Sequence, residues 1–187
     1  MNQIWQYWKP GITTGQCDLI IEVGDDEPLA EAGLGFDGAT VNDQYRSSEI
    51  RWIPTGLKPD LTNQLWSFAH MANRNAFGFD ISYLNDIQYT TYYADDNGKY
   101  DWHHDTFWGN PTAFDRKISI VIQLSDPRDY EGGDFEIDPQ YEALPAEEIR
   151  AKGTVIAFPS FIRHRVTPVT KGVRRSLVCW VEGPKFR

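Results

Sequence analysis

The chain has 187 residues, with 18 lysines and arginines against 27 aspartates and glutamates, which gives a formal net charge of −9. This length suits one domain of ordinary size. The composition, 41% hydrophobic and 14% aromatic, is typical of a globular protein. The acidic balance argues against a nonspecific nucleic-acid binder, because phosphate backbones are bound by positive charge. No apolar run approaches the roughly 20 residues that a bilayer span requires, so no membrane is expected as a partner.

The first residues and the cysteines bear on the expected cellular location of the protein. The first residues contain neither a basic stretch nor a following apolar stretch, so a secretory signal is not expected. Two cysteines, Cys17 and Cys179, are too few for a disulfide framework. Reduced, partly buried thiols in a cytoplasmic protein are the simpler expectation.

The first 80 residues mix helical and irregular signals. The stretch Thr14–Val23 predicts a short helix, with Thr13 or Thr14 as N-cap and Gly24 as its end. The glycine-rich segment Gly33–Asn42 is expected to form a loop. Asp60 is the expected N-cap of a second helix. Its apolar face is indicated by residues at helical spacing: Leu61, Leu65, Phe68, Ala69 and Ala72.

From about residue 81 the pattern changes to short apolar runs separated by turn residues. Many short strands with such punctuation predict a sandwich or barrel of antiparallel strands, with the earlier helices covering one face. We therefore expect one domain over residues 1–187, with an N-terminal helical and irregular part (1–80) and a β core (81–187). The expected strands are Ile87–Tyr93, Lys117–Leu124, Asp134–Ile137, Thr154–Phe158, Arg163–Val169 and Val173–Val181.

The four histidines contain a candidate metal site. On an extended strand, His103 and Asp105 point to the same side, whereas His104 points away and is interpreted as a surface or packing residue. His70, in the helical stretch, is interpreted as structural or surface. His164 lies on another expected strand and can supply a third ligand. Two histidines and one carboxylate leave three coordination positions open, which suits non-haem Fe(II). Zinc hydrolases more often leave only one position open.

The residues after His164 predict how an organic ligand is held. A three-residue loop, Thr170–Gly172, is expected to join two antiparallel strands, with Val169 opposite Val173. In that register His164 pairs with Val178. The residues that share its face are then Arg174, Ser176, Val178 and Trp180.

Arg174 is therefore expected in the same interior as His164, about 13 Å further along the strand. A guanidinium there can bind the far carboxylate of a small dicarboxylic acid whose near end chelates the metal. Ser176 can donate a second hydrogen bond to that carboxylate, while Arg175 faces outward. The alternative is that Arg174 is an exposed charge on an edge strand, since a slip of one residue would exchange the two faces.

Five short motifs, taken together with their order along the chain, resemble those of a known family. The sequence from about residue 87 to residue 184 resembles the 2-oxoglutarate and Fe(II)-dependent oxygenases, in the prolyl 4-hydroxylase-like branch. The first 80 residues resemble the family only loosely. The resemblance implies a mainly β fold, a double-stranded β-helix or jelly roll, with N-terminal helices packed on the major sheet. The motifs are Tyr100-x-x-His103-x-Asp105, Arg116-x-x-Ser119, Gly132-Gly133-Asp134-Phe135, Gly153–Pro159, and His164 followed ten residues later by Arg174.

The resemblance implies roles for individual residues. His103, Asp105 and His164 match the iron ligands. Arg174 matches the basic residue that holds the C5 carboxylate of 2-oxoglutarate, a position where many relatives have lysine. Tyr92 matches a tyrosine that bonds the same carboxylate, with Tyr93 and Tyr89 as alternatives. Strand parity favours Tyr92.

A second group of matches concerns the substrate. Tyr100, Arg116 and Trp180 match positions that line the substrate in prolyl hydroxylases. Core packing is the alternative for Trp180, and a rim contact or surface ion pair is the alternative for Tyr100 and Arg116. Gly132-Gly133 and Phe158-Pro159 are interpreted as turn and packing determinants.

The implied activity is hydroxylation of an unactivated C–H bond, with Fe(II), 2-oxoglutarate and O₂ as requirements, ascorbate as a candidate stimulant, and succinate and CO₂ as coproducts. Asp105 favours hydroxylation, because related halogenases lack this carboxylate. A prolyl residue in a peptide or protein is the expected substrate, and free proline, another amino acid or a different side chain remain open.

Two other classes remain. A noncatalytic, cupin-like metal-binding module would not need Arg174, Ser176 and Tyr92. A zinc hydrolase with the same triad would need a nearby general base, for which Glu131 and Asp134 are candidates.

Overall fold

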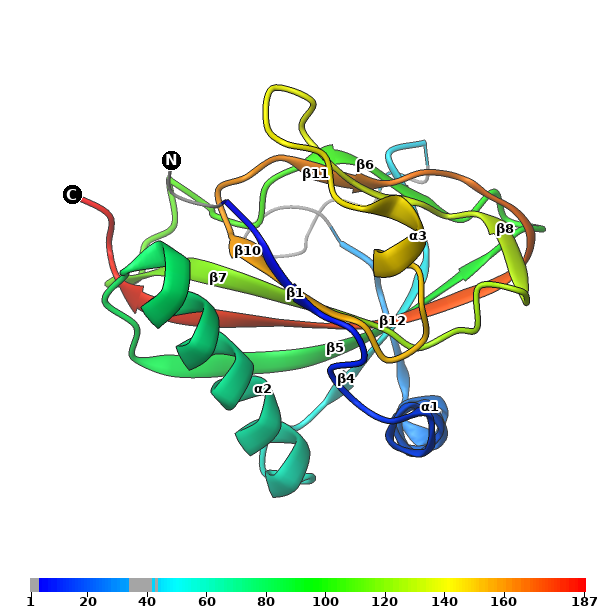
Figure 1. Ribbon diagram of the computed structural model, residues 1–187, viewed down its shortest axis with the longest axis horizontal. Coiled ribbons are helices and arrows are strands. Elements are labelled where there is room, and N and C mark those ends of the chain that lie inside the picture. The colour runs from blue at the N-terminus through cyan, green and yellow to red at the C-terminus, as the bar shows by residue number, and fades with distance from the viewer. Residues whose placement is uncertain (1–3, 34–41, 43) are drawn as a thin grey trace.

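The computed structural model describes residues 4–33, 42 and 44–187. Its framework is two facing antiparallel sheets with helices on one outer side, the jelly roll that the resemblance implies (Figure 1). The eight-stranded sheet has the order β1 (Gln6–Trp8), β10 (Val155–Pro159), β7 (Phe114–Gln123), β12 (Val169–Pro184), β5 (Tyr83–Tyr93), β4 (Glu49–Ile53) and β2 (Leu29–Ala30), and β8 (Tyr130–Gly132) pairs with β12. The four-stranded sheet has the order β3 (Arg46–Ser47), β6 (Lys99–His103), β11 (His164–Val166) and β9 (Phe135–Ile137).

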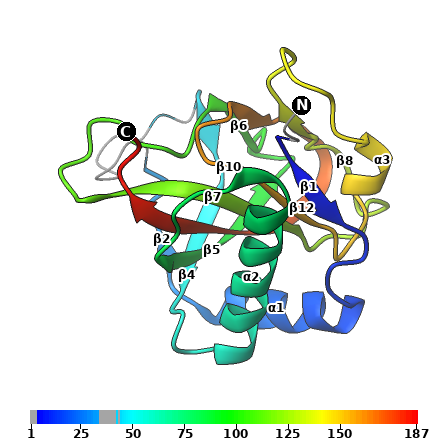
Figure 2. The same ribbon diagram turned by 60° about the vertical axis from the view of Figure 1, so that its left-hand side comes forward.

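The helices α1 (Thr14–Asp26) and α2 (Pro59–Ala72) both lie against the outer face of the large sheet (Figures 1 and 2). A π-helical turn, η1 (Asn73–Phe77), continues α2, and a short helix, α3 (Ala146–Ile149), precedes β10. One hydrophobic cluster joins α1 and α2 to the large sheet. A second cluster lies between the sheets. The space between the sheets is therefore part core and part cavity.

Helix α1 begins where the sequence predicts and ends later. Thr13 is the N-cap, and it forms a capping box with Gln16. The helix runs through Gly24 to Asp26, so the predicted end at Gly24 is wrong. Gly24 packs against the ring of Tyr89, where an added Cβ would lie 2.5 Å from the ring carbon Cγ. The glycine is thus required by close packing of helix on sheet and not by a helix stop.

Replacing Gly24 with alanine is expected to destabilise the protein by about 1–3 kcal/mol, the usual effect of overfilling a packed core. The matched control is Gly15→Ala in the same helix, where an added Cβ would meet nothing within 4 Å. That control is expected to stabilise by about 0.5–1 kcal/mol, because alanine is the better helix former. Urea unfolding of both variants measures the difference, and equal effects would contradict this packing.

Helix α2 confirms the predicted apolar face but not the predicted cap. Its N-cap is Lys58, and Pro59 occupies the first turn, where its missing N–H has no helical partner to lose. Asp60 lies within the first turn, so its assignment as N-cap is wrong. The face is buried as expected, with Leu65, Phe68, Ala69 and Ala72 buried and Leu61 partly buried. The predicted loop Gly33–Asn42 lies almost wholly outside the described residues.

The predicted hairpin after His164 is wrong. Strand β11 pairs with β6 and β9, and β12 pairs along its first residues with β8, so the two segments belong to different sheets. His164 lies opposite His103 and Ile137, not Val178. The chain passes between the sheets at Thr167-Pro168, and a proline cannot donate to a strand ladder. The positive φ of Gly172 instead allows close approach to the carbonyl of Asp129.

The face assignment that rested on this hairpin is nevertheless correct. Alternate residues of β12 line the cavity between the sheets, namely Arg174, Ser176, Val178, Trp180 and Glu182. Alternation along one strand is independent of which strand lies beside it. The other predicted strands are found with shifted bounds. Strands β1, β2, β3, β4 and β8 were not predicted, and β6 was expected only as the extended chain at His103.

Both cysteines are free and fully buried. Burial raises the pKa of the Cys17 thiol to about 11, and burial also raises the pKa of Cys179. In the part of the chain that the structure describes, no helix is both long enough and apolar enough to cross a bilayer.

Candidate active site

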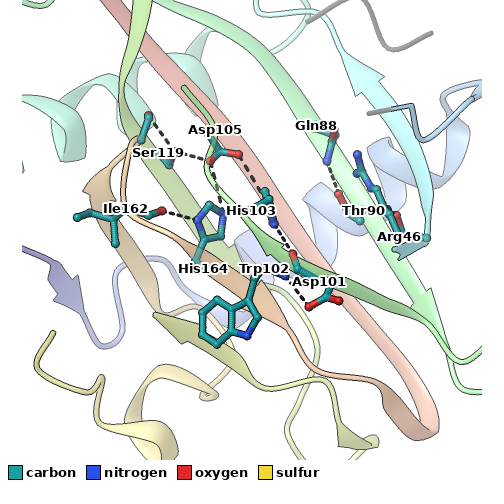
Figure 3. Close-up of polar contacts among 12 residues, drawn as sticks. Arg46, Gln88, Thr90, Asp101, Trp102, His103, Asp105, Ser119, Ile162 and His164 are labelled. Atoms are coloured by element: carbon teal, nitrogen blue, oxygen red, sulfur yellow. Dashed lines mark hydrogen bonds and ion pairs between the residues drawn. The ribbon is translucent and has the colours of Figure 1, made fainter. Parts of the chain in front are cut away.

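Strand pairing brings the three candidate metal ligands together. His103 ends β6 and His164 begins β11, and the two residues are opposite each other in the antiparallel register. Asp105 lies two residues beyond β6, where its N–H donates to the carbonyl of Ser160 at 2.8 Å. The ligand atoms all lie within 4.8 Å of one another. His103 Nε2 is 3.7 Å from Asp105 Oδ1, and His164 Nε2 is 3.6 Å from Asp105 Oδ2 (Figure 3).

Each of the three metal-binding side chains is oriented by a hydrogen bond. The Nδ1 atoms of His103 and His164 lie 2.7 Å and 2.9 Å from the carbonyls of Asp101 and Ile162. Donation from Nδ1 leaves the Nε2 lone pair of each ring available to a metal. The Ser119 hydroxyl donates to Asp105 Oδ2 at 2.6 Å (Figure 3). These contacts fix the direction of all three ligand groups before any metal arrives.

The protonation states at neutral pH also suit a metal. Burial and the neighbouring His164 lower the pKa of His103 to about 3, although Asp105 acts in the opposite direction. Burial alone would raise the pKa of Asp105, but His164, His103, Arg116 and the Ser119 hydrogen bond lower it to about 2. A neutral imidazole and an ionised carboxylate are the forms that ligate metals.

Replacing Ser119 with alanine is expected to weaken metal binding by roughly 10–100-fold, the usual effect of removing a hydrogen bond that orients a ligand. Ser160 is the matched control, because its Oγ lies 2.9 Å from Ser119 Oγ and no hydrogen bond joins it directly to the Asp105 side chain. Ser160→Ala should therefore weaken binding less. Titration with Co(II), a redox-stable substitute for Fe(II), compares the two variants. An equal loss in both would show that Asp105 does not depend on the Ser119 hydroxyl.

A cavity of about 580 Å³ extends from the triad between the sheets and contains Arg174. This guanidinium is 1% exposed. Its Nη2 donates to Gln123 Oε1 at 2.9 Å and its Nη1 to Ser176 Oγ at 3.4 Å, while Nε is buried without a partner. No carboxylate pairs with it among the described residues. A buried cation without a counter-ion fits a pocket for an anionic ligand.

The tyrosine beside this pocket is Tyr92. It lies opposite Arg174 in the register of β5 and β12, with its ring centre 5.3 Å from the guanidinium carbon. Tyr92 lines the cavity. The hydroxyl of Tyr89 instead donates to Asp25, and that of Tyr93 to Glu49. Of the three tyrosines considered from the sequence, the structure thus brings only Tyr92 to the cavity.

The glycine pair before β9 has the packing role inferred from the sequence. At Gly133 an added Cβ would lie 2.9 Å from Arg174 Cδ, and at Gly132 it would lie 2.2 Å from the carbonyl oxygen of Pro168. Both residues have positive φ. The pair therefore leaves room for the Arg174 side chain, and Phe158 similarly packs on the ring of His164.

The three candidate substrate residues line the same cavity. Tyr100 stacks on His103, with 3.5 Å between ring centres and 12° between planes. The guanidinium of Arg116 lies 3.8 Å from the ring centre of Trp180. Trp180 is 5% exposed, and its Nε1 is buried without a partner. His104 is exposed, as expected, and contributes only to the lining of the cavity.

Sequence reasoning missed several residues that line this cavity. Arg46, on β3, lies opposite Tyr100 in the register and places its guanidinium 4.5 Å from the Tyr100 ring centre. Gln88 also lines the cavity, and it donates to Thr90 (Figure 3). Arg46 lies where the sequence has no motif, so only the fold could find it. Gln88 shares the parity of Tyr92, which could have identified it.

Comparison with known proteins places the chain in a family. Residues 87–182 match the 2OG-Fe(II) oxygenase superfamily, and this match covers about half of the chain. The chain belongs to that superfamily, whose standard requirements are Fe(II), 2-oxoglutarate and O₂. The donor set described above, two imidazoles and a carboxylate beside a buried guanidinium, fits both the metal and the cosubstrate.

The curated relatives are PKHD-type hydroxylases. One from Synechococcus sp. (strain CC9311) is 38% identical over 85 residues, which are 46% of this chain and 37% of that protein. One from Thermosynechococcus vestitus is 44% identical over 69 residues, or 35% of this chain and 28% of that protein. The match therefore spans only about a third of each relative.

Solved structures share the fold over nearly the whole chain. A viral collagen prolyl hydroxylase from Paramecium Bursaria Chlorella virus-1, in a 2OG complex, has a TM-score of 0.71 at 15% identity and covers 97% of both chains. A Pseudomonas putida prolyl-4-hydroxylase has a TM-score of 0.72 at 18% identity and covers 97% of this chain and 94% of its own.

Proposed function

We propose that the protein is a 2-oxoglutarate- and Fe(II)-dependent dioxygenase that hydroxylates an unactivated C–H bond, releasing succinate and CO₂. We propose a prolyl residue in a peptide or protein as its substrate. One observation carries the proposal: a single cavity contains three convergent metal-ligand groups and a buried guanidinium without a counter-ion. The names of the curated relatives and of the structural neighbours support the same chemistry.

The proposed roles follow from the contacts of each residue. His103, Asp105 and His164 hold Fe(II), and Arg174, Ser176 and Tyr92 hold the far carboxylate of 2-oxoglutarate. Iron with its cosubstrate supplies the oxidising chemistry, and the protein supplies binding, orientation and exclusion of water. The neutral and ionised states of the ligands at neutral pH mean that no proton has to leave His103 or Asp105 when the metal binds.

The remaining residues are proposed to position the substrate. Tyr100 stacks on a metal ligand, so a substrate group against Tyr100 lies beside the reacting centre. Trp180 and Arg116 form the neighbouring wall. The unpartnered Trp180 Nε1 can donate to a substrate carbonyl. Aromatic walls also keep bulk water from the reacting C–H bond.

A product screen tests the proposal. The protein is incubated with Fe(II), 2-oxoglutarate and air, with and without ascorbate, against proline-containing peptides, free proline and other amino acids. We expect a proline-containing peptide to gain one oxygen atom and an equal amount of succinate to form. Product from free proline alone would reassign the substrate. Absence of both product and succinate with metal-loaded protein would contradict the proposed activity.

The alternative readings receive less support. Glu131 pairs with Lys171, Asp134 pairs with Arg150, and neither carboxylate lines the cavity of the triad, so a hydrolytic base is absent at the positions suggested by sequence. A noncatalytic metal module would not require the buried pocket of Arg174. Two buried free thiols support the cytoplasmic location expected from the sequence, and the net charge of −9 remains the reason to expect no nucleic acid as partner.

A further inference from the structure

The cavity has two ends, and only one is explained by the cosubstrate. Alternate residues of β12 face inward from Arg174 to Glu182. Ser119, which holds the metal ligand Asp105, lies opposite Trp180 in the register of β7 and β12. The metal site therefore lies between the Arg174 end and the Glu182 end of the cavity. The Glu182 end lies on the far side of the metal site from the proposed 2-oxoglutarate pocket.

Glu182 is held in place by two neutral donors from β5. Tyr83 Oη donates to Oε2 at 2.5 Å, and Asn85 Nδ2 donates to Oε1 at 2.5 Å. A carboxylate can accept about four hydrogen bonds, so both oxygens keep acceptor capacity. Within the described ranges, no lysine, arginine or histidine forms an ion pair with it. This carboxylate is thus preorganised to accept a further donor.

Arg116 lies opposite Glu182 in the register of β7 and β12. The guanidinium of Arg116 lies 3.8 Å from the ring centre of Trp180 and 5.3 Å from that of Phe107. Its charge also acts on Asp105, whose pKa it lowers. The guanidinium of Arg116 is placed against these two rings, and the Glu182 carboxylate is held by Tyr83 and Asn85.

Aromatic residues line the same cavity as this carboxylate, and one of them, Tyr83, contacts it. Trp52, Trp180, Tyr83 and Phe114 line the cavity together with Glu182. Trp52 and Trp180 lie 6.2 Å apart between ring centres, and Tyr83 and Phe114 lie 5.4 Å apart. The Trp180 ring already carries the Arg116 guanidinium, so a ligand cation would meet the carboxylate and the rings of Tyr83, Phe114 and Trp52 in this cavity. The net charge of −9 adds long-range attraction for a positively charged ligand.

We propose that the Glu182 end is a cation-recognising subsite, so that the substrate carries an ammonium or guanidinium group close to its reacting residue. This inference rests on the proposed hydroxylase function of the same cavity. The cation has two sources, a basic side chain next to the proline or a free α-amino group. Both would place a positive charge on Glu182 while the reacting C–H bond lies by the metal site.

Binding of matched peptides tests the subsite without requiring turnover. Three N-acetylated, C-amidated peptides with a central proline differ at one neighbouring residue, which is lysine, glutamine or glutamate, and a fourth is the glutamine peptide with a free α-amino group. Affinities are measured anaerobically by calorimetry on protein loaded with Co(II) and 2-oxoglutarate. We expect the lysine peptide, the free-amine peptide or both to bind about two- to five-fold more tightly than the acetylated glutamine peptide. Comparison of the lysine peptide with the free-amine peptide shows which of the two groups supplies the positive charge.

Substitutions assign the preference to this residue. Glu182→Gln should abolish the preference for the cationic peptides, and Glu182→Lys should reverse it toward the glutamate peptide. Glu22→Gln is the matched control, because it removes the same charge from an exposed position on α1 outside the cavity. Equal or undetectable binding of the lysine and glutamate peptides, or a preference that survives Glu182→Gln, would overturn the subsite. Failure of the hydroxylase function is seen separately, as absence of oxygenated product from peptides that bind.

Discussion

Replacing His164 or Asp105 with alanine is expected to abolish succinate formation. Either change leaves two of three ligand groups, and the loss should exceed the roughly 10–100-fold expected when only an orienting hydrogen bond is removed. Metal affinity, measured with Co(II), should fall together with succinate formation. Unchanged turnover in either variant would contradict the assignment of ligands.

The controls separate loss of a ligand from loss of structure. His104 is the sequence neighbour of His103 and has an exposed side chain, so His104→Ala should keep the metal affinity. His164 also packs between the rings of Phe158 and Phe135, which makes an unfolding measurement necessary. His164→Gln keeps much of the side-chain volume. It should lose metal binding while keeping the unfolding temperature of the metal-free protein.

Replacing Arg174 with methionine is expected to raise the KM for 2-oxoglutarate at least about 30-fold, since loss of one partner from a buried charge pair costs about 2–5 kcal/mol. Metal affinity should not change, because Arg174 contacts none of the three ligands in the structure. Arg174→Lys should retain part of the affinity, because lysine keeps the charge but not the bidentate geometry. Steady-state kinetics and direct binding of 2-oxoglutarate provide the measurements.

The same substitution should not destabilise the ligand-free protein. A buried guanidinium without a counter-ion opposes folding, so a methionine of similar length is expected to leave the unfolding temperature unchanged or to raise it. Arg175→Met is the matched control on the opposite face of β12, and it should leave the KM for 2-oxoglutarate unchanged. An equal rise in KM for both variants would show that Arg174 does not bind the cosubstrate directly.

Local spacing was sufficient to predict most of the candidate site. His103 and Asp105 are two residues apart, and the inward residues of β12 alternate from Arg174 onward, so both sets follow from strand geometry alone. The partner of each strand could not be predicted in this way. The sequence around Gly172 is typical of a hairpin, but Pro168 lies at the passage between sheets, and β12 pairs with β8. Long-range pairing is decided by tertiary packing and not by turn residues.

The residues missed by sequence analysis share a cause. Arg46 belongs to no recognisable spacing, and it reaches the cavity because its strand lies beside a strand that carries a motif. The sequence predicts Gly24 as a helix end. In the structure it is a glycine because the ring of Tyr89, from a strand far along the chain, leaves no room for a Cβ. Such contacts depend on how the helices and the two sheets are packed.

Anaerobic titration with Fe(II) and 2-oxoglutarate tests whether the triad and Arg174 bind metal and cosubstrate together. A 2-oxoacid chelated to Fe(II) gives a visible charge-transfer absorption, which reports on metal and cosubstrate together. We expect this band to appear at one equivalent of each in the unchanged protein, to vanish in His164→Gln, and to require much more 2-oxoglutarate in Arg174→Met. Binding of Fe(II) and 2-oxoglutarate without this band, or a band unaffected by loss of His164, would show that the triad is not the metal site.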